Sequence, residues 1–426
     1  MIEFDPNSVY VVSGHGLPNY MCSSIVKRLH RNAHQIMTNY GYRFPVSKVP
    51  FGSTVYIVNF NYDINVMEEL SKSYHLIWIT NNPAVIEGAG QAGFNPPGLR
   101  REDISSCEAT WRYCFPDLPL PLSVKLVSDW DMWKFLHKDT GSFHQGCNLL
   151  SLYPSDKSIT TWNRILNDDD ELVPDIISKG AVIEEYTTAR DIELLKDLAF
   201  TANIAGLKCL CVNTRGINSL FFDSVTNKDQ YDAFISFGWI PSLNKYRVTA
   251  WATNDTGDIS PLLLHHNGGG KPGVGGWMDE RPILGNITKD NAPEVVFDDH
   301  MNELYATYIR NNTVRAFNAK HERINVKSQM HKGYWHGYNC AFTNSAFTWP
   351  DIWFNVDTTD CSLAIAYVYT NTGKWRLIIT NLTNVDLGRV ANLVGGKIVN
   401  NEVWAYIDAE DVPGLPIFNE GYDTTH

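Results

Sequence analysis

The chain has 426 residues, of which 44% are hydrophobic and 19% charged, and its formal net charge is −12. At roughly 150 residues per domain, this length predicts two or three domains with sizeable cores. The acidic balance argues against duplex DNA as a partner, because DNA binding needs a basic face, but it allows a small phosphorylated ligand in a local basic pocket.

Compartment is indicated by the N-terminus, the apolar runs and the cysteines. Residues 1–5 (MIEFD) do not read as a signal peptide, and no run of 18 apolar residues occurs. The eight cysteines form no Cys-x-x-Cys pair, which is typical of reduced, buried thiols. We therefore expect a cytoplasmic protein without a membrane partner.

The first 150 residues alternate strand and helix patterns. Strands are expected at 8–13, 53–60 and 75–80, and helices at 21–32, 65–71, 105–114 and 122–137. This alternation predicts an α/β domain with a doubly wound, mostly parallel sheet. Ligands of such sheets lie beyond the carboxyl ends of the strands. His15, Asn59 and Asn81, each at or just past a strand end, should therefore lie near one another.

The remainder of the chain predicts three more segments after a first domain at 1–150. Residues 151–231 are interpreted as a mostly helical connector, although a strand pattern returns at 208–213. A smaller C-terminal α/β domain follows at 232–286. Residues 287–426 are expected to hold an insert and a second, degenerate copy of that domain.

Short matches in the same order indicate the duplication. Residues 245–248 (KYRV) resemble 374–377 (KWRL), and Gly269-Gly270-Lys271 resembles Gly395-Gly396-Lys397. The offset changes by no more than about two residues between successive matches, as a repeat requires. Chance similarity remains the alternative, because each match is short.

A glycine-rich loop stands out at residues 266–277 (HNGGGKPGVGGW), where six glycines and one lysine fall within twelve residues. Glycine allows backbone N–H groups to approach a ligand closely, and successive N–H groups form an anion site. Lys271 adds charge, and Arg247, in the strand before the loop, is a further candidate for contacting phosphate. The alternative is a tight or flexible surface turn.

The order of motifs resembles the DHH phosphoesterase family, most closely its nanoRNase branch. A strand leads to His15 and Asn19, a second ends in Val58-Asn59-Phe60, and a third ends in 79–82 (ITNN). The resemblance implies that His15 stands at a metal-binding histidine and Asp131, within 127–133 (VSDWDMW), at a metal-binding aspartate. It also implies that residues 268–276 form the phosphate-holding loop of a DHH-associated domain.

The departures from the family pattern concern the metal ligands. Leu17 and Asn19 replace two aspartates, Asn59 replaces another, and Thr80-Asn81-Asn82 replaces Asp-His-His. Lys271 replaces the histidine of the loop. The family uses two metal ions, usually manganese, to activate water and clamp phosphate, and hard divalent ions need anionic oxygen ligands. With two of these ligands retained, we expect no metal, no cofactor and no catalytic residue.

These departures predict a catalytically degenerate phosphodiesterase-like protein that binds a nucleotide, dinucleotide or cyclic dinucleotide without cleaving it. Such a protein would suit a phage-type sponge of nucleotide signals, and homodimerisation is plausible for the fold. The alternatives are an active, Mn²⁺-dependent phosphodiesterase or oligoribonuclease, and a protein-interaction scaffold on a dead enzyme fold. The residues expected to bind ligand are His15, Asn19, Asn59, Asn81, Asn82, Asp131, Arg247, Gly268, Gly269, Gly270, Lys271, Gly275 and Gly276.

Overall fold

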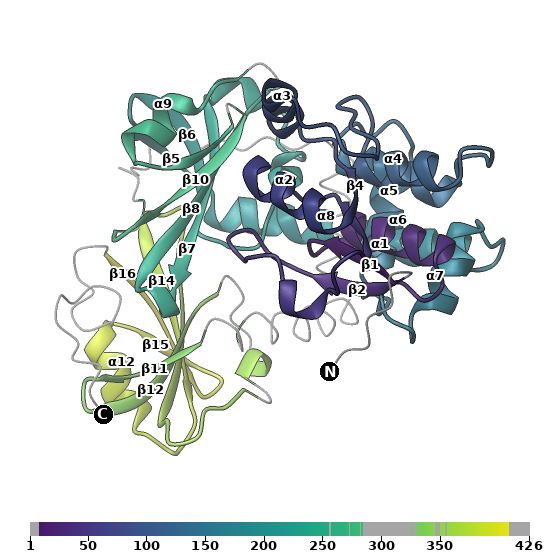
Figure 1. Cartoon of the computed structure of the whole chain (residues 1–426). Coiled ribbons are helices and arrows are strands. Elements are labelled where there is room, and N and C mark those ends of the chain that lie inside the picture. Colours follow the sequence, from purple (N-terminus) through teal and green to yellow (C-terminus); the bar gives the residue numbers. More distant parts are fainter. Residues whose placement is uncertain are drawn as a thin grey trace. The chain divides into compact units, whose positions relative to one another are not determined.

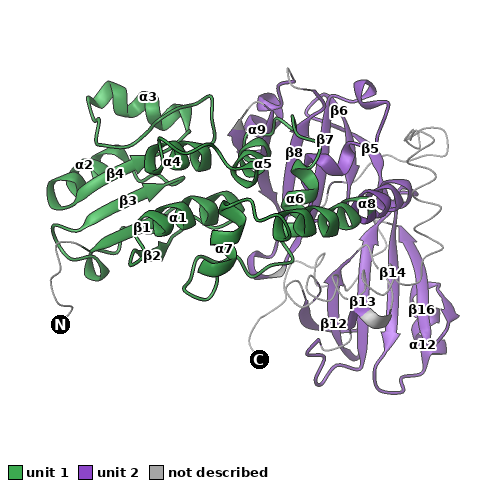
Figure 2. Cartoon of the chain, turned by 90° about the vertical axis from the view of Figure 1, so that its right-hand side faces the viewer, with its two compact units in different colours: residues 1–185 green, residues 186–426 purple. Residues whose placement is uncertain are grey.

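The computed structural model describes residues 8–254, 257–271, 273–281, 283, 326, 330–345, 350–353 and 356–408. The chain divides into two compact units, residues 1–185 and 186–426 (Figure 2). The fold is α/β in class (Figure 1). Within the described residues, no helix combines the length and the apolar composition needed to span a bilayer.

Unit 1 contains a four-stranded parallel sheet in the order β2-β1-β3-β4. Its strands are β1 (Val9–Ser13), β2 (His34–Met37), β3 (Thr54–Val58) and β4 (His75–Ile79). Its helices are α1 (Leu17–Leu29), α2 (Ile64–Ser73), α3 (Pro83–Ala92), α4 (Ser106–Cys114), α5 (Leu122–Asp131), α6 (Thr140–Cys147) and α7 (Ile159–Leu166), and α8 (Leu172–Leu198) continues into unit 2.

Helices cover both faces of this sheet, as the doubly wound prediction requires. Val11 packs in one core cluster with residues of α1, α4, α5 and α7, whereas its neighbour Val12 packs in another with residues of α2 and α3. Successive side chains of a strand point to opposite faces. Because both faces are buried, the strands read as apolar runs in the sequence.

Several elements of unit 1 differ from the predicted ones, among them β2 and α5. Strand β2 was missed because its residues are half-buried or exposed, so that it lacks an apolar run. Helix α5 ends at Asp131 and not near residue 137. Both oxygens of the Asp129 carboxylate accept hydrogen bonds from the following loop, from the N–H of Leu136 at 3.0 Å and of His137 at 2.9 Å, and these bonds fold the chain back after the helix.

Unit 2 contains two six-stranded sheets with the same strand order and the same pairing directions. The first, β5-β6-β7-β8-β10-β9, and the second, β11-β12-β13-β14-β16-β15, each have one parallel pair in otherwise antiparallel surroundings. The first sheet comprises β5 (Phe200–Ile204), β6 (Leu207–Val212), β7 (Ala233–Ile240), β8 (Lys245–Ala252), β9 (Gly269–Lys271) and β10 (Val274–Asp279). The second comprises β11 (His331–Trp335), β12 (Tyr338–Asn344), β13 (Leu363–Tyr369), β14 (Lys374–Asn381), β15 (Lys397–Val399) and β16 (Glu402–Asp408). The helices α9 (Ser260–His265) and α12 (Leu387–Val394) occupy equivalent places.

This repeat corrects the expected connector and the expected alignment of the copies. In the stretch assigned to the connector, residues 151–231, the last α-helix ends at Leu198 and the first sheet already begins at Phe200. The N–H of Gly268 donates to the carbonyl of Leu263, and the N–H of Gly396 makes the same bond to Ala391. Gly268 is therefore equivalent to Gly396, and Lys397 does not correspond to Lys271. The expected insert lies largely outside the described residues.

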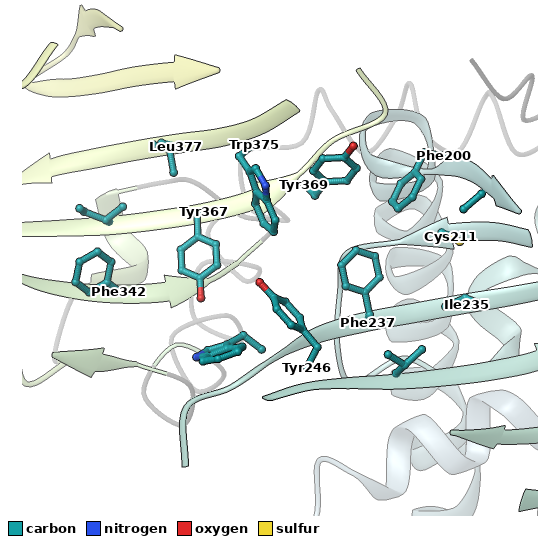
Figure 3. Close-up of a cluster of buried hydrophobic side chains, with 14 of the residues drawn as sticks. Phe200, Cys211, Ile235, Phe237, Tyr246, Phe342, Tyr367, Tyr369, Trp375 and Leu377 are labelled. Carbon is teal, nitrogen blue, oxygen red and sulfur yellow. The ribbon is translucent and has the colours of Figure 1, made fainter. Parts of the chain in front are cut away.

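The two sheets share one aromatic core (Figure 3). The rings of Phe200 and Tyr369, one from each sheet, lie 5.1 Å apart in an edge-on arrangement. Cys209 and Cys211 both point into this core, as their period-two spacing predicted.

A pair of asparagines joins the sheets beside this core. The amide of Asn213 donates to the carbonyl of Phe237 and accepts from the N–H of Tyr369. Asn344 repeats the pattern, donating to the carbonyl of Tyr367 and accepting from the N–H of Trp239. The two side chains also bond each other at 2.9 Å and 3.3 Å, so the link between the sheets is nearly two-fold symmetric.

Candidate functional site

The carboxyl ends of β1, β3 and β4 meet at one edge of the unit 1 sheet, where the sequence places its polar residues. The register pairs Val12 with Ile57, and the N–H of Asn59 donates to the carbonyl of Ile79 at 3.0 Å. Asn59 has the left-handed backbone conformation (φ 49°), which ends β3 at this point. The parallel topology therefore places the ends of these strands at a common edge, as predicted.

Asn19 uses its side chain to close the turn between β1 and α1. Its Oδ1 accepts from the N–H of Gly14 at 3.2 Å, and its Nδ2 donates to the carbonyl of His15 at 2.9 Å. An aspartate could accept the first bond but could not donate the second. His15 is exposed and makes an edge-on ring contact with Tyr20, with centroids 6.4 Å apart.

The asparagines after β4 have different surroundings. Asn81 accepts from the hydroxyl of Ser106 at 2.9 Å, and its Nδ2 lies 3.2 Å from Sδ of Met132, so it joins the start of α4 to the end of α5. Asn82 is the N-cap of α3 and accepts from the N–H of Val85 at 3.4 Å. Capping accounts for an asparagine at position 82 without a ligand.

Asp131, at the end of α5, is the carboxylate that the family resemblance placed in a metal site. Burial raises its pKa to about 6, and its charge in turn raises the pKa of the Cys22 and Cys107 thiols, whose pKa values are raised mainly by burial. No hydrogen bond or ion pair joins the Asp131 carboxylate to another described residue. Among the described residues, no three His, Cys, Asp or Glu side chains are grouped so that they could hold a metal ion.

The glycine-rich segment of unit 2 is a β-hairpin and not the expected open loop. Gly269 pairs with Gly276 across β9 and β10, and Gly276 pairs in turn with Thr249 of β8. A Cβ added at Gly268 would lie 2.7 Å from the carbonyl oxygen of Gly276, and one at Gly276 would overlap the backbone of Val248. Close packing of strands therefore accounts for these glycines. Some backbone N–H groups of β9 and β10 therefore take part in sheet pairing.

Other glycines of the hairpin have different explanations. A Cβ at Gly270 would overlap the opposite strand at Gly275, and one at Gly275 would press on Leu263 of α9. A Cβ at Gly269 or Gly273 would meet no atom within 4 Å. Packing therefore does not explain why Gly269 and Gly273 are glycines.

Two arginines lie close together on the first sheet of unit 2. Arg247 is exposed on β8 and is paired in register with Gly238 of β7. The aliphatic part of Arg215 packs over Gly238, where a Cβ would overlap it, and its Nη1 donates to the carbonyl of Trp239 at 2.7 Å. Burial lowers the pKa of Arg215, and the charge of Arg247 lowers it further.

The guanidinium groups of this pair, Arg215 and Arg247, form no ion pair with a described residue. Arg247, Thr249 and the position of Gly276 lie on one face of the sheet, since alternate residues share a face and Thr249 pairs with Gly276. Sequence reasoning found Arg247 but missed Arg215, which lies in no motif.

The equivalent arginine of the second sheet has an acidic neighbour. Arg376 stands on β14 where Arg247 stands on β8, and its Nη1 lies 3.8 Å from Oδ2 of Asp197 on α8. Its side chain is only 13% exposed. The two copies therefore share a fold but differ in charge balance.

No protein-family model matches the chain, and no curated protein matches its sequence. Solved structures do match. One is a pGpG-specific phosphodiesterase, PggH, from Vibrio cholerae, with 13% identity and a TM-score of 0.42, covering 64% of this chain and 93% of that one.

Two further structures match over similar or longer parts of the chain. A DHH domain from a member of a family of ribosomal proteins has 9% identity and a TM-score of 0.38, covering 71% of this chain and 87% of that one. RecJ from Thermus thermophilus, in complex with Mn²⁺, has 9% identity and a TM-score of 0.35, covering 95% of this chain and 68% of that one. At these TM-scores the similarities say nothing of this chain's ligand or reaction. One of these matches is described as a DHH domain, and the order of motifs in the sequence resembles the DHH phosphoesterase family.

Proposed function

We propose that the protein binds a small phosphorylated ligand, a nucleotide, dinucleotide or cyclic dinucleotide, without cleaving it. The observation that carries this proposal is the arginine pair of unit 2. Two like charges side by side are unfavourable unless an anion joins them. Arg215 and Arg247 have no acidic partner among the described residues, and an arginine fork matches phosphate geometry.

The β9–β10 hairpin belongs to the same sheet as Arg247, with Gly276 opposite Thr249 of β8. Gly269 and Gly273 carry no side chain where the structure leaves open space, so a ligand can approach their backbone closely. Lys271 lies between them in the chain, on β9. These residues are the part of the predicted phosphate loop that packing does not explain.

The edge of the unit 1 sheet supports the proposed absence of cleavage. Amides stand where the DHH phosphoesterases that the motif order resembles place carboxylates, and Asn19 and Asn82 already serve the turn and the helix cap. A neutral amide neither balances the charge of a divalent ion nor acts as a base. Asp131 is desolvated, and no other described carboxylate or imidazole joins it in a cluster that could hold a metal ion. The proposed role is therefore that of a binding protein, such as a sponge that sequesters a nucleotide signal.

The test is calorimetry in metal-free buffer with EDTA, using pyrophosphate and a panel of mono-, di- and cyclic nucleotides. Arg247→Ala should weaken binding about 10- to 150-fold, the range expected for loss of one charged hydrogen bond. Lys271→Ala should weaken it as well. Lys397→Ala is the matched control, because this exposed lysine stands on the equivalent strand of the second sheet.

Other outcomes identify the other functions. Hydrolysis of the dinucleotide pApA with Mn²⁺, abolished by His15→Ala, would show an active phosphodiesterase and overturn the proposal. Silence in both assays, with a stoichiometric protein recovered from cells, would instead show an interaction scaffold.

A further inference from the structure

One stretch of unit 1 differs in charge from the rest of the chain. Between Asp5 and Asp63 the sequence has no aspartate or glutamate but five lysines and arginines, although the whole chain has 47 acidic residues and a net charge of −12. The segment between β2 and β3, residues 38–53, lies within this stretch. It exposes both aromatic rings and cations: Tyr40, Tyr42, Arg43, Lys48 and Phe51.

Two of these exposed rings lie flat on a buried ring. Tyr40 is 72% exposed and is stacked on Phe60, with centroids 4.8 Å apart and an interplanar angle of 27°. Phe51 is 66% exposed and is stacked on Tyr74 at 5.9 Å and 2°. Phe60 and Tyr74 are both buried. Because each exposed ring is covered on one face only, a further planar group can extend the stack on the other.

The two stacks lie at opposite ends of β3. Phe60 follows the last residue of β3 by two positions, whereas Tyr74 directly precedes β4, whose first residue pairs with Thr54 at the start of β3. The five residues of β3 span about 17 Å, at 3.3 Å per residue. One base cannot reach both rings, so a partner that stacks on both must carry several planar groups along a chain.

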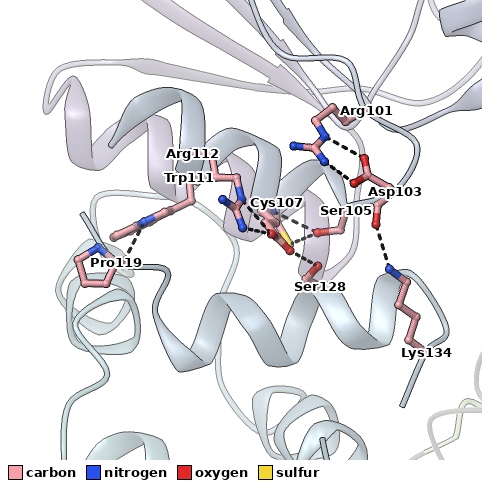
Figure 4. A network of polar contacts seen from close by, with 10 residues as sticks. Arg101, Asp103, Ser105, Cys107, Trp111, Arg112, Pro119, Ser128 and Lys134 are labelled. Atoms are coloured by element: carbon pink, nitrogen blue, oxygen red, sulfur yellow. Dashed lines mark hydrogen bonds and ion pairs between the residues drawn. The ribbon is translucent and has the colours of Figure 1, made fainter. Parts of the chain in front are cut away.

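The cations of this segment have no acidic neighbour. Arg43 and Lys48, which lie between the two exposed rings in the chain, form no ion pair with a described residue. Elsewhere in unit 1 an exposed arginine does have such a partner, as Figure 4 shows for Arg101 and Asp103. The segment at 38–53 therefore presents local positive charge on an acidic chain, which favours an anionic partner.

We propose that the segment at residues 38–53 binds single-stranded nucleic acid. Bases stack on Tyr40 and Phe51, and the phosphates between them lie near Arg43. Binding of single strands without sequence preference combines cations along the backbone with aromatic side chains under the bases. Exposed Lys48 fits a nucleic acid better than a protein partner, because lysine is depleted at protein–protein interfaces. This binding surface lies wholly in unit 1 and is independent of the phosphate site proposed in unit 2.

The test is fluorescence anisotropy of the full chain with labelled oligoadenylates, as RNA and as DNA, in buffer with EDTA. Strands of about eight nucleotides, within the site sizes known for single-strand binding, should bind in both forms, and dinucleotides much more weakly. Tyr40→Leu and Phe51→Leu should each weaken binding of the longer strand about 5- to 150-fold, the range expected for stacking of one base. Tyr40→Phe should retain most of the affinity.

Leucine keeps an apolar contact with the buried ring beneath it, so these variants should melt like the native protein. Arg43→Gln should also reduce the slope of log affinity against log salt by about 0.7, the value for one phosphate contact on a single strand. Tyr406→Leu is the matched control, because this ring is 52% exposed on β16 of unit 2, and its loss should leave binding unchanged.

Three outcomes would overturn the proposal. The first is that the native protein binds neither strand. The second is that Tyr40→Leu and Phe51→Leu bind the longer strand like the native protein while Arg247→Ala does not, which would assign the strand to the phosphate site of unit 2. The third is that no strand binds and that a protein recovered from cells with the native chain is lost in Tyr40→Leu, which would assign the surface to a protein partner.

Discussion

The asparagine pair of unit 2 gives the strongest stability prediction. Asn213 is 1% exposed, and replacing it with alanine leaves the N–H of Tyr369 and the carbonyl of Phe237 without these partners. Each buried polar group without a partner costs about 1 to 3 kcal/mol, so Asn213→Ala should lower the free energy of unfolding by about 2 to 6 kcal/mol. Asn344→Ala should cost less, since Asn344 is only half-buried.

The pair also predicts coupling between the two substitutions. Because Asn213 and Asn344 bond each other twice, the first substitution already removes part of what the second would remove. The double variant should therefore cost about 0.5 to 3 kcal/mol less than the sum of the single variants. Urea denaturation gives the free energies, and hydrogen exchange of peptides covering 237–239 and 367–369 reports the local opening.

Asn203→Ala is the control for this series, because Asn203 is exposed on β5 of the same sheet. It should change stability by no more than about 0.5 kcal/mol. Additive single and double variants, or a loss below about 0.5 kcal/mol for Asn213→Ala, would refute the view that this pair links the sheets.

Three further predictions concern the candidate sites. Burial holds the pKa of Asp131 above its unfolded value, so ionisation of Asp131 destabilises the folded state as the pH rises from about 4 through about 6. Asp131→Asn should therefore stabilise the protein by about 1 to 3 kcal/mol at pH 7.5 and by almost nothing at pH 3.5. Unfolding measured at both pH values without this difference would contradict the raised pKa of Asp131. Gly276→Ala should destabilise the protein by at least about 1 kcal/mol, because its Cβ would overlap Val248. Gly269→Ala should leave the melting temperature unchanged and weaken only phosphate binding. Equal melting temperatures of the two variants would show that packing does not require a glycine at position 276. Asn82→Ala should lower the free energy of unfolding by about 1 kcal/mol, because the N-cap of α3 is lost, and Asn82→Ser should leave it almost unchanged. Loss of nucleotide binding in the serine variant would show that Asn82 also contacts the ligand.

Sequence reasoning was most accurate where burial is continuous. Strands β1, β3 and β4 are buried on both faces, so their apolar runs marked them, and the ends of these runs located Asn59 and Asn81 at one edge. It failed at β2, whose four residues include no fully buried side chain. The sequence of β2 lacks the pattern of apolar residues that predicts a strand, which explains the omission.

The glycine-rich segment shows why a local pattern can mislead about both structure and equivalence. Three or more adjacent glycines resemble a loop, but Gly268, Gly270 and Gly276 are small because neighbouring strands approach them closely. The matching Gly-Gly-Lys letters also suggested a wrong alignment of the two copies. The backbone decides it, since Asn267 and Gly395 take the same left-handed conformation after α9 and α12.

The repeat within unit 2 separates structural need from ligand binding. Both sheets are required for the shared core, because aromatic rings from each complete it and the asparagine pair bonds across it. Only the first sheet leaves an arginine exposed at this strand position; in the second, Asp197 of α8 lies beside Arg376 and balances its charge. The two copies therefore differ in charge at this strand position, since Arg215 and Arg247 have no acidic partner among the described residues. Arg247→Gln should therefore weaken phosphate binding with little effect on stability. Arg376→Gln should lower the free energy of unfolding by up to about 1 kcal/mol with little effect on phosphate affinity, since it removes a partly exposed ion pair.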